Sequence, residues 1–270
     1  MNRIARVFKN LQANDSGGFI PFVSAGDPDL ETSREIVKML AKNGADIIEL
    51  GVPFSDPMAD GPTIQASSQR ALDQGVTLTD VLAMVRDIRT ETDVPIVLFS
   101  YLNPLFRYGI ERLADDAASA GADGVLVTDA VDEDAAAIAS VLRDRDLDLI
   151  SLVAPTTSDD RLKRIAENAS RFIYAVSRAG VTGARDETST AAEALVARIR
   201  KFSDLPVAVG FGISTREQIE DVWRYADAAV VGSAIVAEIE RSKGRADVVD
   251  QVRSFVASLL PEVAKDAVET

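Results

Sequence analysis

The sequence contains no cysteine and no histidine among its 270 residues. The absence of cysteine excludes disulfides, thiolate nucleophiles and cysteine-ligated zinc or iron–sulfur sites. The absence of histidine excludes Ser-His-Asp triads, histidine bases and histidine-ligated metal centres. Any acid–base catalysis in this chain must therefore use carboxyl groups, tyrosine or lysine.

Positive charge is also scarce. The chain has 43 acidic residues, 28 of them Asp, against 29 basic ones that include only seven Lys, and its net charge is −14. Such a field repels phosphate backbones and anionic lipid, so we expect neither nucleic acid nor a membrane as partner. Two interpretations stay open: an ordinary acidic surface, or adaptation to a high-salt (halophilic) cytoplasm in which the charge is screened.

Long apolar runs are absent as well. No stretch approaches the roughly 20 apolar residues of a membrane span. The basic, amphipathic segment Met1–Asn10 leads into no apolar run of the kind found in a secretory signal. We therefore expect a cytoplasmic protein whose first residues form an extra N-terminal helix.

Short apolar runs alternate with longer amphipathic stretches along the whole chain. Runs bounded by Gly, Pro or Asp predict strands buried on both faces, at Gly18–Ser24, Asp46–Gly51, Pro95–Tyr101, Gly124–Thr128, Leu147–Val153, Phe172–Val176, Pro206–Gly210 and Ala228–Gly232. Helical periodicity, in places with a plausible N-cap such as Asp159 or Thr215, predicts helices that include Leu30–Asn43, Thr79–Thr90, Ile110–Ala120, Asp134–Arg145, Asp159–Asn168, Ala191–Phe202 and Thr215–Arg224.

This order of elements predicts a single (β/α)8 TIM barrel over residues 1–270. An open doubly wound sheet is the alternative, but it usually carries GxGxxG after its first strand, and Phe22–Pro28 has none. The similar stretches Asn43–Asp46 and Ala120–Asp123, each entering a strand, indicate repeated βα units. In a barrel, the catalytic residues belong to the carboxyl ends of the strands and the loops that follow them.

The predicted strand Asp46–Gly51 carries an unusual residue, Glu49. Strand alternation places Ile47 and Glu49 on one face and Ile48 and Leu50 on the other, and both faces of a barrel strand are normally buried. A salt-bridged or hydrogen-bonded core glutamate is the structural alternative. Because a buried carboxyl group with a raised pKa suits general acid–base catalysis, we predict that Glu49 is catalytic.

The loop Val52–Pro62 follows this strand and contains three Pro and one Gly. Those residues stiffen the chain, which suits a loop that must present Asp56 or Asp60 at a fixed place. Ordinary turn chemistry, in which Asp precedes Pro or Gly, accounts for the same residues equally well.

Glycine-rich loops follow the last three predicted strands, at Ala179–Gly183, Gly210–Ser214 and Gly232–Ser233. Backbone N–H groups in such loops, before helix N-termini, predict a phosphate site that uses no Lys or Arg, although each loop alone is often a tight turn. The polar segment Thr182–Thr190 is interpreted as a lid over this phosphate, or as a linker without a role.

Together these motifs resemble the tryptophan synthase α subunit family over most of the chain. The matching segments are Ile20–Pro28, Glu49–Pro62, Tyr101–Pro104, Ser177–Gly183 and Gly210–Ser214. The resemblance implies a TIM-barrel lyase that cleaves indole-3-glycerol phosphate to indole and glyceraldehyde 3-phosphate in a retro-aldol reaction.

The resemblance also implies roles for single residues. Glu49 would protonate indole C3 and help to deprotonate the glycerol hydroxyl, while Asp60 would hold the indole N–H and stabilise the positive intermediate. Tyr174 falls on the family's active-site tyrosine and Thr182 on its lid residue. The remaining expected contacts are Phe22, Phe99, Tyr101, Leu126 and Phe211 around the indole, where plain barrel core is the alternative for the apolar walls, and Gly183, Gly212, Gly232 and Ser233 at the phosphate.

A partner follows from the same resemblance: a pyridoxal-phosphate-dependent β subunit in an α2β2 complex, which receives indole through a tunnel. The pyridoxal phosphate belongs to that partner, and no cofactor or metal is expected in this chain. Pro53, Asp56 and the loop after the sixth strand are the family's communication elements. One departure bears on this coupling, because Asp129-Ala130-Val131 stands where the family commonly has Asp-x-Pro.

Two other functions remain as alternatives. A related barrel, indole-glycerol-phosphate synthase, is expected to have catalytic Lys at strand ends, whereas the seven Lys here fall on helical stretches or their ends. The same distribution leaves no candidate for a Schiff-base nucleophile. A non-catalytic barrel that only activates a β subunit is disfavoured by the intact Glu49 and Asp60, because a buried carboxyl group without a role is costly.

Overall fold

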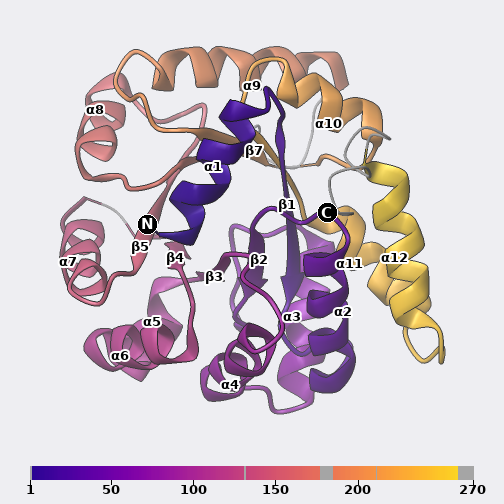
Figure 1. Cartoon of the computed structure of the whole chain (residues 1–270). Coiled ribbons are helices and arrows are strands. Elements are labelled where there is room, and N and C mark those ends of the chain that lie inside the picture. Colours follow the sequence, from indigo (N-terminus) through magenta and orange to yellow (C-terminus); the bar gives the residue numbers. More distant parts are fainter. Residues whose placement is uncertain (1, 131, 177–184, 211, 261–270) are drawn as a thin grey trace.

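The computed structural model describes residues 2–130, 132–176, 185–210 and 212–260. Its centre is a closed barrel of parallel strands in which each strand pairs with the next and β8 pairs with β1 (Figure 1). All eight predicted strands are present, with ends within two residues of the prediction. The strands are β1 (Gly18–Ser24), β2 (Ile48–Gly51), β3 (Ile96–Ser100), β4 (Gly124–Val127), β5 (Asp148–Val153), β6 (Ile173–Val176), β7 (Val207–Gly210) and β8 (Ala228–Val231).

A ring of helices surrounds the barrel, and each helix contacts the next around the ring. This arrangement confirms the (β/α)8 fold, because every strand is followed by one ring helix. The ring consists of α2 (Leu30–Lys42), α4 (Leu78–Arg89), α6 (Ile110–Ala120), α7 (Asp132–Arg143), α8 (Asp159–Asn168), α9 (Arg185–Ile199), α10 (Arg216–Trp223) and α12 (Val248–Leu259).

Further helices lie outside this ring. The predicted N-terminal helix is confirmed as α1 (Arg3–Ala13), which lies across the front of the barrel in Figure 1. Its Ile4 and Phe8 join the apolar cluster inside the barrel, and the Phe8 ring lies 5.5 Å from the Phe172 ring at the start of β6. Helix α1 therefore covers the amino ends of the strands.

Three short helices are inserted between a strand and its ring helix. They are α3 (Pro62–Asp73) after β2, α5 (Leu102–Tyr108) after β3 and α11 (Ser233–Ser242) after β8. None of the three, nor α12, was among the predicted helices. Because each insertion follows the carboxyl end of a strand, all three lie at the end where a barrel carries its chemistry.

The core has two layers, as the alternation of strand residues requires. Inside the barrel lies an apolar cluster that includes Ile47, whereas Ile48 and Leu50 belong to the layer between barrel and helices. The prediction that Ile47 and Glu49 share one face of the strand, opposite Ile48, is therefore confirmed. Glu49 is directed into the barrel and is fully buried.

Aspartates fix the register at the amino ends of three strands. Asp46 accepts a hydrogen bond from the Phe19 N–H at 2.7 Å, and Asp123 accepts one from the Ile96 N–H at 2.9 Å. Asp227 accepts in the same way from Val207 at 2.8 Å. The Ala-Asp stretches thus mark equivalent positions before β2, β4 and β8, where each Asp bonds to the preceding strand.

Two predictions of helix ends differ from the structure. Thr215 caps α10 as predicted, but the N-cap of α8 is Ser158, not Asp159, because the Ser158 side chain accepts from the Arg161 N–H. The adjacent Asp159 lies instead in the first turn of α8. Helix α9 begins at Arg185, six residues before the predicted start at Ala191.

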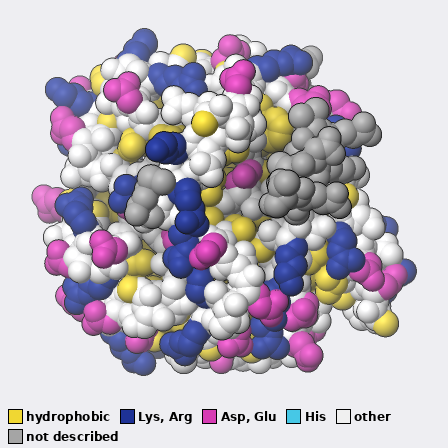
Figure 2. All heavy atoms as spheres, viewed as in Figure 1, with side chains coloured by type: hydrophobic (Ala, Val, Ile, Leu, Met, Phe, Trp, Pro, Cys, Tyr) yellow, Lys and Arg dark blue, Asp and Glu magenta, His cyan; other side chains and the backbone are white. Residues whose placement is uncertain are grey.

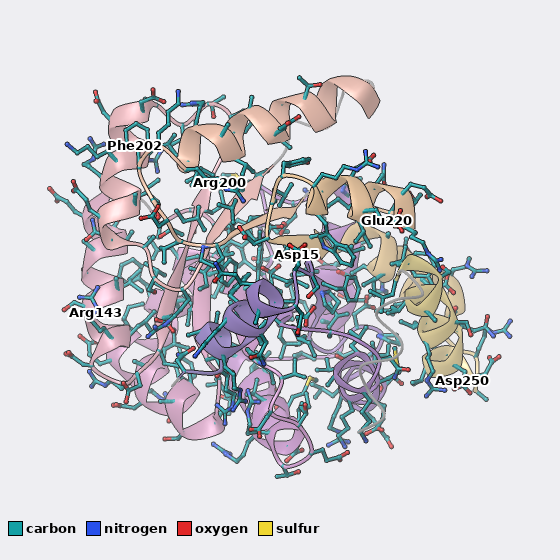
Figure 3. All side chains as sticks on the ribbon, turned by 45° about the horizontal axis from the view of Figure 1, so that its top comes forward. Asp15, Arg143, Arg200, Phe202, Glu220 and Asp250 are labelled. Carbon is teal, nitrogen blue, oxygen red and sulfur yellow. The ribbon has the colours of Figure 1, made fainter. Side chains whose placement is uncertain are left out.

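Charged side chains of both signs cover the surface. Figure 2 shows Lys and Arg interspersed with Asp and Glu on the face viewed in Figure 1. Figure 3 shows the same mixture around the ring, with Arg143 of α7 and Asp250 of α12 on opposite sides. In the part of the chain that the structure describes, no helix combines the length and apolar character that crossing a bilayer requires.

Candidate active site

Glu49 occupies the inner face of β2, beside Phe22 of β1 and Val97 of β3 in the strand register. Both of its carboxyl oxygens are buried, and neither has a hydrogen-bond partner among the described residues. Desolvation raises the pKa of Glu49 to about 8. The alternative of a salt-bridged or hydrogen-bonded core glutamate is therefore wrong, and the side chain holds a proton at neutral pH.

Asp60 lies in the loop between β2 and α3 and is partly buried. Its carboxylate accepts a hydrogen bond of 3.0 Å from the Tyr101 hydroxyl, which in turn accepts one of 3.0 Å from the Ala59 N–H. Burial raises the pKa of Asp60 to about 6, and the hydrogen bond from Tyr101 opposes this rise. Asp60 is therefore largely ionised at neutral pH.

The loop that carries Asp60 is attached to the start of α3. The Phe54 N–H donates to the Ser68 hydroxyl at 3.1 Å, and the Gln65 side-chain amide donates to the Asp60 carbonyl at 2.9 Å. Asp56 differs from Asp60: it is exposed and its carboxylate accepts from the Ser55 hydroxyl. The structure thus separates the two predicted aspartates and places only Asp60 in the pocket.

Tyr174 extends from β6 into the apolar cluster inside the barrel. Its pKa is raised well above the ordinary value, first by burial and then by the charges of Glu49 and Asp60. The end of β7 makes room for this ring, since a Cβ added to Gly210 would lie 2.0 Å from the Tyr174 hydroxyl oxygen. Tyr174 therefore lies within electrostatic range of both carboxyl groups, although neither Tyr174 nor Glu49 lines the cavity beside Asp60.

Aromatic rings form the wall of the pocket. Phe22 and Phe99 meet edge to face with centroids 5.2 Å apart, and Phe54 packs on Tyr101 with centroids at 5.3 Å. The cavity itself is about 10 Å³, which is room for about one water molecule. Its lining is Phe22, Ser24, Gly51, Val52, Phe54, Asp60, Ile64, Ser68, Phe99 and Tyr101.

Several lining residues were not predicted. Ser68 and Ile64 lie on α3, a helix absent from the prediction, and Ser24 at the end of β1 shares a hydrogen bond of 2.6 Å with Ser67. The position of Ser24 at a strand end was the available signal. Leu126, which was predicted to contact the indole, belongs to the apolar cluster inside the barrel and is not among the residues that line this cavity.

The predicted phosphate residues fall at the ends of neighbouring strands β7 and β8. Gly212 has a φ of +77°, which glycine adopts readily. Gly232 is the N-cap of α11 and Ser233 is its first residue, and no side chain caps this helix. The N–H groups of the first turn of α11 are therefore available to an anion.

Other predicted site residues lie outside the described residues: Thr182, Gly183 and Phe211. The predicted lid spans this gap, but its residues 185–190 form the start of α9. At the predicted partner surface, Pro53 is buried and Asp56 is exposed. Beside them Met58 is 90% exposed. Within the described ranges, no group of three or more Asp or Glu is placed to hold a metal ion.

The fold is a TIM barrel, and two carboxyl groups of different protonation lie toward the carboxyl ends of its strands, where enzymes of this fold carry their active sites. The sequence profile of the family described as "Tryptophan synthase alpha chain" matches residues 8–264. The chain belongs to this family, whose members are lyases that catalyse the α reaction.

Individual relatives agree with this assignment. The tryptophan synthase alpha chain of Geobacter sulfurreducens is 48% identical over 259 residues, covering 96% of this chain and 98% of the relative. That of Citrifermentans bemidjiense is 49% identical over 265 residues, covering 98% and 99%. Among solved structures, tryptophan synthase subunit alpha of Legionella pneumophila has a TM-score of 0.88 at 37% identity, covering 96% of this chain and 97% of the other.

Proposed function

We propose that this chain cleaves indole-3-glycerol phosphate by a retro-aldol reaction in which Glu49 moves the proton and Asp60 holds the positive charge. The observation that carries this proposal is the contrast between the two carboxyl groups. Glu49 is fully buried with no hydrogen-bond partner in the described part of the chain, whereas Asp60 is hydrogen-bonded and ionised. Between about pH 6 and about pH 8 the first is an acid and the second an anion.

The proposed reaction begins with transfer of the Glu49 proton to C3 of the indole. The ring then carries a positive charge, and the Glu49 carboxylate can accept the proton of the hydroxyl next to the bond that breaks. When the bond between C3 and the side-chain carbon breaks, its electron pair returns to the ring and the side chain leaves as an aldehyde. Glu49 ends protonated, as it began, so it acts as both acid and base.

Asp60 and the tyrosines stabilise the charged intermediate. The Asp60 carboxylate would accept the indole N–H, whose acidity rises when C3 is protonated. Tyr101 holds this carboxylate in place through its hydroxyl. The charges of both carboxyl groups raise the pKa of Tyr174. The Tyr174 ring would contact the substrate between Glu49 and Asp60.

The indole would lie against Phe22 and Phe99, with Leu126 and Phe211 completing the apolar surroundings. The cavity beside Asp60 has room for about one water molecule. We therefore expect pocket side chains or the Asp60 loop to move outward when an indole ring binds. The exposed position of Met58 in this loop suits such a movement, because little apolar contact holds its tip.

The phosphate would bind at the backbone N–H groups of Gly183, Gly212, Gly232 and Ser233. The uncapped first turn of α11 supports this placement, and its first turn carries no acidic side chain that would repel an anion. Thr182 would close the site after the phosphate has bound.

The partner would be a tryptophan synthase β subunit, in an α2β2 complex, with pyridoxal phosphate in that subunit and no cofactor in this chain. Pro53 and Asp56 belong to the same loop as Asp60, so a partner bound to this loop would act directly on the site. The exposed side chains of Met58 and of Phe106, which is 54% exposed on α5, support a docking surface on these elements.

Residues 1–270 would form one domain. We propose that it is active in the cytoplasm of a cell with high internal salt, because its net charge of −14 favours a medium that screens the repulsion among its carboxylates.

The test is release of indole from indole-3-glycerol phosphate by the purified chain in molar KCl, with and without a β subunit. We expect Glu49→Gln to lower kcat by about 10²–10⁴-fold, the usual contribution of a positioned acid–base group. The matched control is Glu111→Gln, which changes an exposed glutamate on α6 and should leave the rate unchanged. Equal activity of Glu49→Gln and wild type would refute the role of Glu49. No release under any condition would favour the non-catalytic partner.

A further inference from the structure

Arg70, on α3, connects two helices and a loop at the carboxyl end of β1. Its guanidinium donates to both carboxylate oxygens of Asp27, at 2.7 and 2.9 Å, and to Oε1 of Glu240 at 3.0 Å. Asp27 lies between β1 and α2 and is 1% exposed, whereas Glu240 lies on α11 with a side chain that is 43% exposed. The contact with Asp27 fixes α3 to the barrel, and the contact with Glu240 joins α3 to α11.

Helix α3 is attached to the end of the site that carries Asp60. It begins at Pro62, directly after the Asp60 loop, and Gln65 donates to the Asp60 carbonyl. A second contact joins the Phe54 N–H to Ser68, and a third joins Ser67 to Ser24 of β1. A small displacement of α3 must therefore move Asp60.

Helix α11 is attached to the other end of the site. It begins at Ser233 with an uncapped first turn, where the phosphate is proposed to bind. Helices α3 and α11 pack against one another and against β1, as their neighbouring positions in Figure 1 show. Arg70 and Glu240 form an ion pair across this contact and so join the two helices.

We propose that the ion pair of Arg70 and Glu240 is a positioning contact that couples phosphate binding at α11 to the placement of Asp60 through α3. This inference rests on the proposed phosphate site. When an anion binds at α11, it fixes the position of α11 and, through this ion pair, the position of α3. Asp60 is then already in place when the indole ring binds. Because such coupling is reciprocal, phosphate must tighten indole binding by the same factor by which indole tightens phosphate binding.

Glu240 is the residue to change. Removing Arg70 would leave the buried Asp27 without its cation and risks unfolding the chain. Glu240→Gln instead removes the charge of this contact, and with it the ion pair between the packed helices, while Arg70 stays on Asp27. A half-exposed ion pair contributes little to stability. Arg241→Gln is the control for the stability of α11, because it removes the cation of Glu238, which is 6% exposed, within the same helix. Lys243→Gln is a second control, since the Lys243 Nζ lies 3.7 Å from the same Glu240 oxygen that Arg70 contacts.

The experiment measures the dissociation constant of indole by equilibrium titration, with and without saturating inorganic phosphate. In the wild type we expect phosphate to tighten indole binding by about fivefold, at the lower end of ordinary coupling. In Glu240→Gln we expect phosphate still to bind but the tightening to be lost, at an unchanged melting temperature. Arg241→Gln and Lys243→Gln should keep the tightening.

Each other result decides against the proposal. Equal tightening in the wild type and in Glu240→Gln, or no tightening in the wild type although phosphate binds, overturns the coupling and leaves the phosphate site standing. Loss of the tightening in Arg241→Gln as well would show that the coupling depends on the general stability of α11 and not on the ion pair of Arg70 and Glu240. If the wild type binds no phosphate at all, the proposed phosphate site fails, and this inference fails with it.

Discussion

At the scale of single residues, the site depends on two carboxyl groups that differ only in their surroundings. Glu49 has no hydrogen-bond donor and no cation among the described residues, so desolvation alone raises its pKa. Asp60 is less deeply buried and receives the Tyr101 hydroxyl, so its pKa rises less. The same functional group thus supplies an acid and an anion at one pH, which a chain without histidine requires.

Tyr101→Phe tests this balance through the pH dependence of kcat/KM. In the wild type, the hydrogen bond from Tyr101 lowers the pKa of Asp60. Removal of the hydroxyl must therefore raise this pKa above about 6. Asp60 is active as the anion, and the acidic limb of the profile therefore shifts to higher pH. One hydrogen bond of about 1 kcal/mol corresponds to a pKa shift of about 0.7 unit. At pH 6, where about half of the wild-type Asp60 is ionised, we therefore expect an activity about threefold lower than that of the wild type.

The control for this measurement is Tyr108→Phe, which removes the hydroxyl that donates to Asp116, on α6. Its profile should match that of the wild type. Acidic limbs that coincide in Tyr101→Phe and the wild type would show that Tyr101 does not tune Asp60.

Sequence reasoning reached Glu49 but not its surroundings. Glu49 stands out in a one-dimensional pattern, because a charge inside a strand buried on both faces conflicts with its neighbours. The hydrogen bond between Tyr101 and Asp60 joins residues 41 positions apart and depends on how a loop folds back over β3. No local periodicity records such a contact, so the residue pattern could not choose between Asp56 and Asp60, and only the family resemblance pointed to Asp60.

At the scale of elements, local sequence patterns predicted the strands but not the helices α3, α5 and α11 that are inserted between a strand and its ring helix. The strands were predictable because short, continuous apolar runs between Gly, Pro and Asp are typical of strands buried on both faces. Helix α3 was missed because buried Ser67 and Ser68 interrupt its apolar face. Helix α5 has only seven residues and contains Pro104, and α11 starts at a Gly-Ser pair that equally suits a turn. These inserted helices supply pocket-lining side chains and the helix N-terminus at which we propose that phosphate binds. The part of the fold that surrounds the candidate site was therefore the less predictable part.

The end of β7 offers a prediction about how neighbouring strands fit together. A methyl group at Gly210 would lie 2.0 Å from the hydroxyl oxygen and 2.6 Å from the ring of Tyr174, so Gly210→Ala must displace this ring from the two carboxyl groups. We expect destabilisation of about 1–3 kcal/mol, as for other overpacked cores. We also expect a loss of kcat, measured beside urea unfolding.

Gly61→Ala is the matched control for packing, because none of the described residues lies within 4 Å of its added Cβ. Its free energy of unfolding should change by no more than a few tenths of a kcal/mol, since alanine restricts the unfolded chain but is a poorer N-cap of α3 than glycine. If Gly210→Ala unfolds at the same urea concentration as Gly61→Ala and keeps full activity, the ring of Tyr174 has room that the structure does not show.

At the scale of the whole molecule, the two ends of the barrel serve different purposes. The amino end is closed by α1, whose Arg3 pairs with Asp123 at 3.2 Å, and Arg89 pairs with the same aspartate at 2.8 Å. The carboxyl end carries the pocket, the inserted helices and the exposed Met58. The amino end thus carries ion pairs to the buried Asp123, whereas the carboxyl end carries the loops in which barrels of this fold place their chemistry.

The net charge of −14 leads to a prediction for the whole chain in KCl. Salt screens both the repulsion among excess carboxylates and the exposed ion pairs such as that of Arg253 and Asp250, but each exposed pair contributes little. Repulsion therefore dominates, and the melting temperature should rise by about 5 °C between 0.1 and 1 M KCl, over which the Debye length falls from about 10 to about 3 Å.

NaCl at the same ionic strength is the control and should give the same rise if screening is the cause. A continued rise in KCl beyond 1 M, where little repulsion is left to screen, would indicate bound ions and support a high-salt cytoplasm. A melting temperature that falls when KCl is added would show that the ion pairs outweigh the repulsion, and the halophilic interpretation would then be wrong.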